Sequence, residues 1–334
     1  MERTSLSPSV TRMVGLTAAM VSFEESSELL RELAGVTVDA KQVERTAEAL
    51  GAEIAEDETI HVERLEQPCS TMYVGLDGTG VPVRRSELEG REGKQPDGSA
   101  KTREVKLCTV WSAEGRDKDG IPIRDEGSVT YSAAIESAAS SDGKVSDFAR
   151  RVERETTRRG FEHAARQVAL GDGAAYIWNT VSEVLPFAIQ ILDRFHAKQH
   201  LSDVSKAIYG AANDAAKEWA NARHDELDDG KIDDILVALE VHAPACQDAR
   251  QCVGYVSANR ERMRYPEFHA QGLCTSTGVV EAGCKVAIGT RLKRAGMHWT
   301  VSGANAIIAL RCTKLSGRFE DFWERRALAR TAAA

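Results

Sequence analysis

Residues 167–180 read QVALGDGAAYIWNT, a short apolar run that is interrupted by glycine and aspartate and followed by a helical pattern. Val168, Ala169 and Leu170 are typical of a buried strand, and Trp178 falls about one turn into the next helix, where we expect it in the core. Asp172 stands between two glycines at the end of that strand. A turn is the simplest interpretation, because Asp and Gly both favour turns. The alternative is a ligand or acid–base group, because open α/β sheets bind ligands at the carboxyl ends of their strands.

A second carboxylate, Asp77, has the same kind of context. TMYVGLDG (71–78) predicts a buried strand that ends at Asp77-Gly78. Further strands are predicted at 105–113 and 128–136, then a helix at 144–160, the strand before Asp172, a helix at 173–185 and a strand that ends at Asp193. This order predicts a mixed α/β sheet in which the strands before Asp77 and Asp172 are neighbours. The charged, glycine-rich stretch between the first two strands is expected to be a loop or a β-arm.

A third carboxylate, Glu281, lies in the apolar string GVVEAGCK (278–285), on a helix predicted from about Thr277 to near Gly296. We expect this helix to pack on the sheet, where an acid must be paired, protonated or metal-bound. An ion pair with Lys285, four residues further on, is the simpler alternative. Clustered carboxylates need a cation, and hard oxygen donors favour two Mg²⁺ (or Mn²⁺) ions about 3.5–4 Å apart, as in phosphoryl transfer.

The 334 residues allow about two domains. Residues 22–51 predict two helices, the first with a capping box from Ser22 and Glu25, and 52–70 a polar linker. About eighty residues separate Asp193 from the next interesting carboxylate, too many for a loop, so an inserted helical domain is expected. The predicted organisation is an acidic helical segment and linker (1–70), the first part of a catalytic core (71–200), a helical insertion (201–272), the rest of the core with a basic C-terminal region (273–320) and a tail (321–334).

The net charge of −8 is unevenly distributed. Residues 1–70 hold 6 basic and 14 acidic residues, whereas 281–334 hold 10 basic and 4 acidic ones. A basic C-terminal region permits DNA binding, although the negative net charge of the whole chain does not suggest it. No stretch approaches the roughly 18 apolar residues of a membrane span, and no signal peptide is recognisable. The 7 cysteines are scattered, which predicts reduced thiols in a cytoplasm.

At this point the chain resembles a known family. The strings LDGTGVPVR, GKQPDGSAKTREVKL, LGDGAAYIWN, QILDRFHAKQHL, GVVEAGCK and RLKRAGMHWTVSGANAIIALR are similar to those of the ISKra group of bacterial insertion-sequence transposases, a relative of the Mutator-like type. The resemblance covers about residues 71–315. It implies a ribonuclease-H-like DDE catalytic domain with Asp77, Asp172 and Glu281 as the metal-binding triad. It also implies that 193–196, Asp-Arg-Phe-His, corresponds to a C/D-x-x-H motif near the scissile DNA.

The amino-terminal part departs from this family, whose members have a longer DNA-binding region there. The chain is therefore expected to be a truncated copy or a fragment. Within residues 1–70 the helices at 22–51 have the spacing of a helix-turn-helix remnant, but the second is poor in Arg and Lys, so a small helical or dimerising hairpin is an equal alternative. The resemblance also implies DNA as the partner, namely transposon ends and target, and a homo-oligomer. The expected location is the bacterial cytoplasm, associated with the nucleoid and not with a membrane.

Asp193, His196 and His200 allow two interpretations. Asp193 and His196 fit a supporting or DNA-contacting role beside the metal ions, with His200 structural, but the three could instead form a zinc or iron set. The basic stretch that follows Glu281 is either a solvated helix end with a core tryptophan or a phosphate-binding surface on which the indole stacks on a base. Its members are Arg291, Lys293, Arg294, His298 and Trp299. Lys94, Lys101, Arg103 and Lys106 are further candidates for DNA contact or for a solvated loop.

These patterns favour a DNA transposase that cleaves a phosphodiester at an element end and transfers the freed 3′-OH to target DNA. Two alternatives stay open. One is a catalytically silent DNA-binding remnant of a transposase, which would bind DNA without cutting it. The other is a metallohydrolase of small substrates built on Asp193, His196 and His200, which would bind zinc or iron tightly and ignore DNA.

Overall fold

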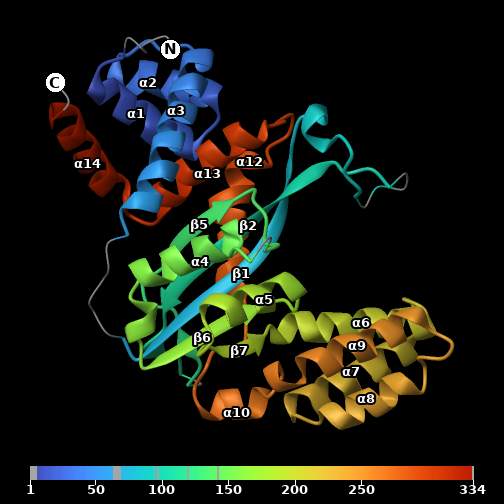
Figure 1. Ribbon diagram of the computed structural model, residues 1–334. Helices are drawn as coiled ribbons and strands as arrows, with labels where there is room; N and C mark the ends of the chain where they lie inside the picture. Colours follow the sequence, from blue (N-terminus) through green and yellow to red (C-terminus); the bar gives the residue numbers. More distant parts are fainter. Residues whose placement is uncertain are drawn as a thin grey trace.

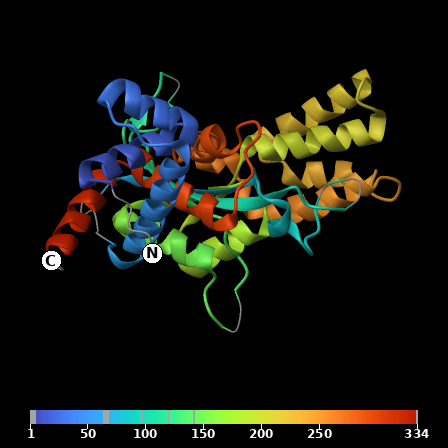
Figure 2. The ribbon, with the colours of Figure 1, turned by 90° about the horizontal axis from the view of Figure 1, so that it is seen from above.

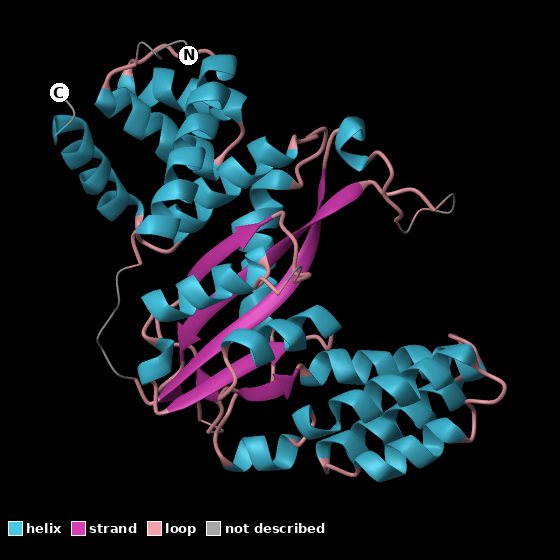
Figure 3. Ribbon diagram, viewed as in Figure 1, coloured by secondary structure: helices cyan, strands magenta, loops and turns pink. Residues whose placement is uncertain are grey.

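A computed structural model describes residues 6–62, 69–93, 95, 98–118, 120–140 and 143–332. Among these residues, five strands form one mixed sheet in the order β5-β2-β1-β6-β7 (Figures 1 and 3). The chain is therefore an α/β protein, as its sequence predicts. The strands are β1 (Thr71–Pro82), β2 (Thr102–Ser112), β5 (Thr130–Ala134), β6 (Arg166–Gly171) and β7 (Ile189–Leu192).

The central strand β1 pairs antiparallel with β2 and parallel with β6. The predicted contact between the strands before Asp77 and Asp172 is thus confirmed. The predicted end of β1 at Asp77-Gly78 is wrong, because pairing with β2 continues as far as Pro82 opposite Thr102. Pairing with β6 stops at Gly75. Asp77 therefore lies beyond the end of one neighbouring strand while the other still holds it in place.

Helices cover both faces of the sheet (Figure 1). On one face lie α4 (Asp147–Arg158), which is followed by the predicted glycine stop at Gly160 (φ +64°), and α5 (Ala175–Val184). On the other face a helical segment runs over 278–292, as α11 (Gly278–Gly283), a π-helical turn (Cys284–Gly289) and α12 (Thr290–Leu292). It packs closely, since a Cβ added at Gly75 would lie 2.0 Å from Val280.

The N-terminal and C-terminal helices form one unit beside the sheet, which we call the N-terminal unit. It contains α1 (Pro8–Met20), α2 (Phe23–Ala34), α3 (Ala40–Ile60), α13 (Val301–Leu315) and α14 (Phe319–Ala332). The predicted capping box of Ser22 and Glu25 is present. The prediction of a linker from residue 52 is wrong, because residues 52–60 are part of α3, and the segment predicted as a tail (321–334) is helical as far as residue 332. Arg326 of α14 pairs with Glu53 of α3, which stabilises both.

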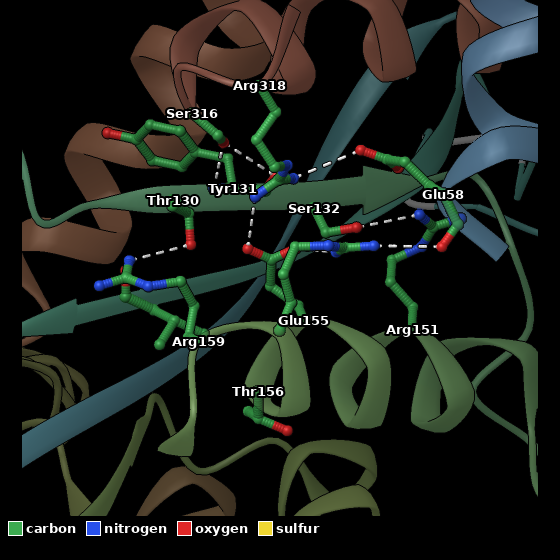
Figure 4. Close-up of polar contacts among 12 residues, drawn as sticks. Glu58, Thr130, Tyr131, Ser132, Arg151, Glu155, Thr156, Arg159, Ser316 and Arg318 are labelled. Carbon is green, nitrogen blue, oxygen red and sulfur yellow. Dashed lines mark hydrogen bonds and ion pairs between the residues drawn. The ribbon is translucent and has the colours of Figure 1, made fainter. Parts of the chain in front are cut away.

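A buried ion network joins this unit to the sheet (Figure 4). Glu155 of α4 is fully buried and accepts hydrogen bonds from Arg158 (2.8 Å) and Arg318 (3.0 Å). Arg318 also reaches Glu58 of α3 (3.3 Å). Burial alone would raise the pKa of Glu155, but the charges of Arg318 and Arg158 outweigh it and lower the pKa. Because a buried charge without a partner is costly, this network keeps α3, α4 and the turn before α14 together.

Residues 194–276 contain five α-helices, which lie beside the β7 edge of the sheet and away from the N-terminal unit (Figures 1 and 2). The segment predicted as an insertion, 201–272, is helical, but its first helix begins earlier, directly after β7. No helix in the described part of the chain is both long and apolar enough to cross a membrane. The helices are α6 (Arg194–Tyr209), α7 (Asp214–Asp228), α8 (Ile232–Glu240), α9 (Gln247–Asn259) and α10 (Tyr265–Ala270).

Two helix glycines provide a matched test of the packing between α3 and α13. A Cβ at Gly51 would lie 2.0 Å from the carbonyl oxygen of Ala306, whereas a Cβ at Gly254 in α9 would meet no atom within 4 Å. Gly51→Ala is expected to lower the free energy of unfolding by about 1–3 kcal/mol through overpacking. Gly254→Ala should raise it by up to about 1 kcal/mol through helix propensity. Urea unfolding measures both, and equal effects of the two substitutions would contradict this packing.

Candidate carboxylate site

Asp77 and Asp172 leave neighbouring parallel strands at matched positions. The last paired residues of β1 and β6 are Gly75 and Leu170, and each aspartate stands two residues further along its chain. Burial raises the pKa of Asp77, and the charge of Asp172 adds to this rise. Hydrogen bonds to Asp77 from the Gly78 amide (2.6 Å) and from a thiol described below oppose it. Asp172 is thus close enough for its charge to affect the ionisation of Asp77.

One carboxylate oxygen of Asp172 takes part in a turn, as the simpler interpretation predicts. Its Oδ1 accepts a hydrogen bond from the Ala174 amide (2.9 Å), just before α5. Its main-chain carbonyl accepts another from the Tyr255 hydroxyl of α9 (2.9 Å). Gly173 is required here because its φ is +99° and because a Cβ would lie 2.6 Å from the Tyr255 ring. The glycine therefore lets the helical insertion contact the Asp172 loop.

Glu281 lies on α11 and is exposed. The expectation of an acid buried against the sheet is wrong, since Val280 makes the close contact with the sheet instead. In the described part of the chain Glu281 forms no ion pair, either with Lys285 or with another cation. Its charge contributes to raising the pKa of His196, so it faces the same region as Asp172, whose charge acts on His196 too. We name Asp77, Asp172 and Glu281 the carboxylate site.

Cys284 is a member of this region that the sequence reasoning missed. Its Sγ donates a hydrogen bond to Oδ2 of Asp77 (3.2 Å). Burial, foremost, and the charge of Asp77 raise the pKa of the thiol, which keeps it protonated and able to donate. Cys284 begins the π-helical turn, a feature often found at functional sites. The sequence feature that could have identified Cys284 is its position three residues after Glu281, which places both on one side of a helix.

Asp193 holds the segment before α11 in place. It is 1% exposed and caps α6, with its Oδ1 accepting from the His196 amide (2.7 Å). Its Oδ2 accepts from the Thr277 hydroxyl (2.6 Å) and from the Thr277 amide. Burial alone would raise the pKa of Asp193, but hydrogen bonds from His196 and Thr277 outweigh it and lower the pKa. Asp193 is therefore a positioning residue, and its burial removes it from contact with DNA.

His196 faces the carboxylate site from α6. Its Nδ1 lies 3.5 Å from Oδ1 of Asp193, and its side chain is 40% exposed. The hydrogen bond to Asp193 raises the pKa of His196, and the charges of Asp172 and Glu281 add to the effect. A protonated imidazole here is thus stabilised by three carboxylates.

The alternative set of Asp193, His196 and His200 does not come together in the structure. The His200 ring packs against Tyr255, with ring centroids 4.2 Å apart, and burial lowers the pKa of His200. Among the residues that the structure describes, no three His, Cys, Asp or Glu side chains are grouped so as to hold a metal ion. That finding covers the carboxylate site as well: the charge of Asp172 acts on Asp77, whereas Glu281 acts on His196 and Cys284.

The basic stretch after Glu281 divides into buried and exposed residues. Arg291 is 0% exposed, and its guanidinium carbon lies 4.7 Å from the centre of the Phe23 ring. Its Nε donates to the carbonyl of Ala18 (2.9 Å), and burial lowers its pKa to about 10. Trp299 is buried, and its Nε1 donates to the carbonyl of Leu292 (3.0 Å). Neither residue can contact DNA in this arrangement. Arg291 is bound to α1, and Trp299 is bound to the end of the helical segment that carries Glu281.

The other three residues of the stretch are exposed. Arg294 pairs with Glu25 through both carboxylate oxygens and lowers the pKa of Glu25 to about 2. Lys293 donates to the Thr79 hydroxyl on the far part of β1. His298 stays at the surface. Lys94 lies outside the described residues. Trp178 is in the core at 6% exposed, as expected, and all seven cysteines, which fall within the described ranges, are free thiols.

Comparison with known proteins does not identify a family. No protein-family model matches the chain, and a search of the curated proteins finds no match either. What the protein does is therefore inferred from its own residues and their arrangement.

The contact between Asp193 and His196 can be tested by titration. Asp193→Asn removes the negative charge, so the pKa of His196 should fall, which NMR of the imidazole signals measures. Asp203→Asn is the control, because Asp203 acts on His200 and not on His196. An unchanged His196 pKa in Asp193→Asn would contradict the assignment.

The same contact has a defined pH dependence. The pKa of His196 is raised in the folded protein, so its contribution to stability is complete below the ordinary value of about 6.5 and is lost as pH rises through the folded pKa. The pKa of Asp193 is lowered, so its contribution is present above about 3.9 and is lost as pH falls through the folded pKa. Asp193→Asn should flatten the dependence of stability on pH in both ranges.

Proposed function

We propose that the protein is a DDE-type DNA transposase with a ribonuclease-H-like core, which cleaves DNA at insertion-sequence ends and joins the freed 3′-OH to target DNA. The observation that carries the proposal is the matched position of Asp77 and Asp172 beyond the pair Gly75–Leu170. Glu281 supplies a third carboxylate from the helix on that side of the sheet. This is the chain order of acids that the sequence resemblance implies.

The arrangement of the chain supports the same proposal. The strands β1, β2 and β5 form the antiparallel half of the sheet, and β6 and β7, each preceded by a helix, extend it in parallel. The helical insertion follows β7 directly, and α11 follows the insertion. A long helical insertion between the second aspartate and the glutamate is what the resemblance predicts for this class of transposase.

The donor set suits Mg²⁺ or Mn²⁺. Three carboxylates provide hard oxygen ligands, and the mutual repulsion of Asp77 and Asp172 is relieved by a divalent cation. Two ions held by Asp77, Asp172 and Glu281 would act as Lewis acids on the phosphoryl group and stabilise the attacking and leaving oxygens.

The other side chains of the region hold these ligands and provide charge. Cys284 orients Asp77, and Tyr255 fixes the loop of Asp172. Asp193 positions Thr277 at the start of the helix that carries Glu281. His196, whose pKa is raised, offers a cation and an N–H donor toward a phosphate near the carboxylates. Such positioning accounts for much of the rate enhancement in phosphoryl transfer. DNA is the partner in this proposal, and assembly of copies on paired ends makes a homo-oligomer.

The proposal predicts DNA nicking that depends on Mg²⁺ or Mn²⁺. The substrate is a supercoiled plasmid that carries the DNA flanking the gene for this chain. Asp77→Asn and Asp172→Asn should each lower the nicking rate by more than about 100-fold, since even residues that only support metal ligands cost 10–100-fold. Asp234→Asn, an exposed aspartate on α8, is the matched control and should nick like the wild type.

The alternatives give different results in the same experiment. A catalytically silent remnant would bind the DNA but leave the plasmid intact with either metal. A His/Asp metallohydrolase would bind zinc or iron tightly, lose that metal in His196→Ala and show no affinity for DNA. Nicking that survives in Asp172→Asn would reject the carboxylate site itself.

A further inference from the structure

A polar groove of about 540 Å³ lies on the face of the sheet that α5 covers. One wall comes from β2 and the segment before it, and the other from α5 and residues 135–139. Tyr176 lines the groove and lies near the carboxylate site, since a Cβ added at Gly78, next to Asp77, would lie 3.1 Å from its hydroxyl. Burial, foremost, and the charges of Glu104, Asp172 and Asp77 raise the pKa of this tyrosine. We call this feature the arm groove.

Two arginines of the arm groove are available to bind an anion. In the described part of the chain, neither Arg91 nor Arg103 forms an ion pair with a carboxylate. The Arg103 guanidinium donates only to a main-chain carbonyl, that of Glu87 (3.4 Å). Burial lowers the pKa of Arg103, the positive charge of Arg91 lowers it further, and the negative charge of Glu87 partly opposes both. Two guanidinium groups that repel each other favour a negatively charged ligand between or beside them.

Two of the acidic residues in the groove are already neutralised. Glu136 receives two hydrogen bonds from Arg151 (2.6 and 2.9 Å). Glu104 pairs with Lys106, whose Nζ also lies 4.1 Å from the centre of the Tyr176 ring. Glu92, next to Arg91, is exposed and is the one lining carboxylate without such a partner among the described residues. The neutral polar side chains of the wall, those of Thr102, Ser137, Tyr176 and Asn179, all carry donor groups.

We propose that the arm groove binds the phosphodiester backbone of the DNA strand that enters the carboxylate site. Phosphates are contacted mainly by Arg and Lys together with Ser, Thr, Asn and Tyr side chains, which is the donor set of this groove. The groove holds the strand through its charge and shape, so its contribution to binding is independent of base sequence. This inference rests on the proposed function, because it takes DNA as the substrate of the nearby carboxylates.

The test measures DNA binding without any divalent metal, so cleavage does not enter. Fluorescence anisotropy of a labelled DNA duplex with a single-stranded extension is followed over a series of NaCl concentrations. Arg91→Gln and Arg103→Gln should each reduce the slope of log K against log salt by about 0.7–0.9 and weaken binding about 5–8-fold at 0.1 M salt. Glu92→Gln should have the opposite effect on affinity and tighten binding, because it removes a repulsive charge from the groove.

Arg260→Gln and Glu261→Gln on the insertion are the matched controls, since they make the same two chemical changes at adjacent exposed positions. They should leave the slope and the affinity unchanged. Binding by Arg91→Gln and Arg103→Gln that equals the wild type, or Glu92→Gln that does not tighten binding, would overturn the groove assignment even if the protein nicks DNA. If the variants behave as expected and the wild type fails to nick with Mg²⁺ or Mn²⁺, the groove stands and the catalytic proposal fails.

Discussion

The carboxylate of Asp193 accepts hydrogen bonds from both ends of the helical insertion, from the His196 amide at its start and from Thr277 at its end. Asp193 and Thr277 are 84 residues apart in the chain, and a long closed loop costs little more entropy than a short one. A second hydrogen bond, from the Arg194 amide to the Thr275 carbonyl (3.0 Å), lies beside the first. The insertion can therefore vary without moving α11, because its ends are held at one point.

The helical segment that carries Glu281 is anchored at its other end as well. Arg291 donates to the carbonyl of Ala18, and Arg311 of α13 donates to that of Ala19 (2.5 Å), at the C-terminal end of α1. Helix carbonyls there lack intrahelical partners and carry partial negative charge, so guanidinium groups stabilise them. Helix α1 thus contributes to the position of the segment that carries Glu281. Removal of α1 would expose Arg291 and Arg311, which are both buried.

The two faces of the sheet carry different side chains near the carboxylate site. On the face of α11, Cys284 contacts Asp77 just beyond the end of the parallel pairing. On the face of α5, Lys106 and Tyr176 pack together next to a groove with two arginines that have no carboxylate partner in the described chain. Because β1 extends past Asp77 while its pairing with β6 stops at Gly75, Asp77 has a paired neighbouring strand on the β2 side only.

Local pattern determined much of this protein: the buried strands, the capping box of Ser22 and Glu25, the stop at Gly160 and the positions of Asp77 and Asp172 follow from apolar runs and glycines a few residues apart. Tertiary structure decided the rest. The true end of β1 depends on its partner β2, the burial of Arg291 depends on Ala18 and Phe23 some 270 residues away, and the contact of Cys284 with Asp77 spans 207 residues. The reason is physical: a periodic pattern records which face of a helix or strand is apolar, but burial, pairing and ionisation depend on atoms that only folding brings together.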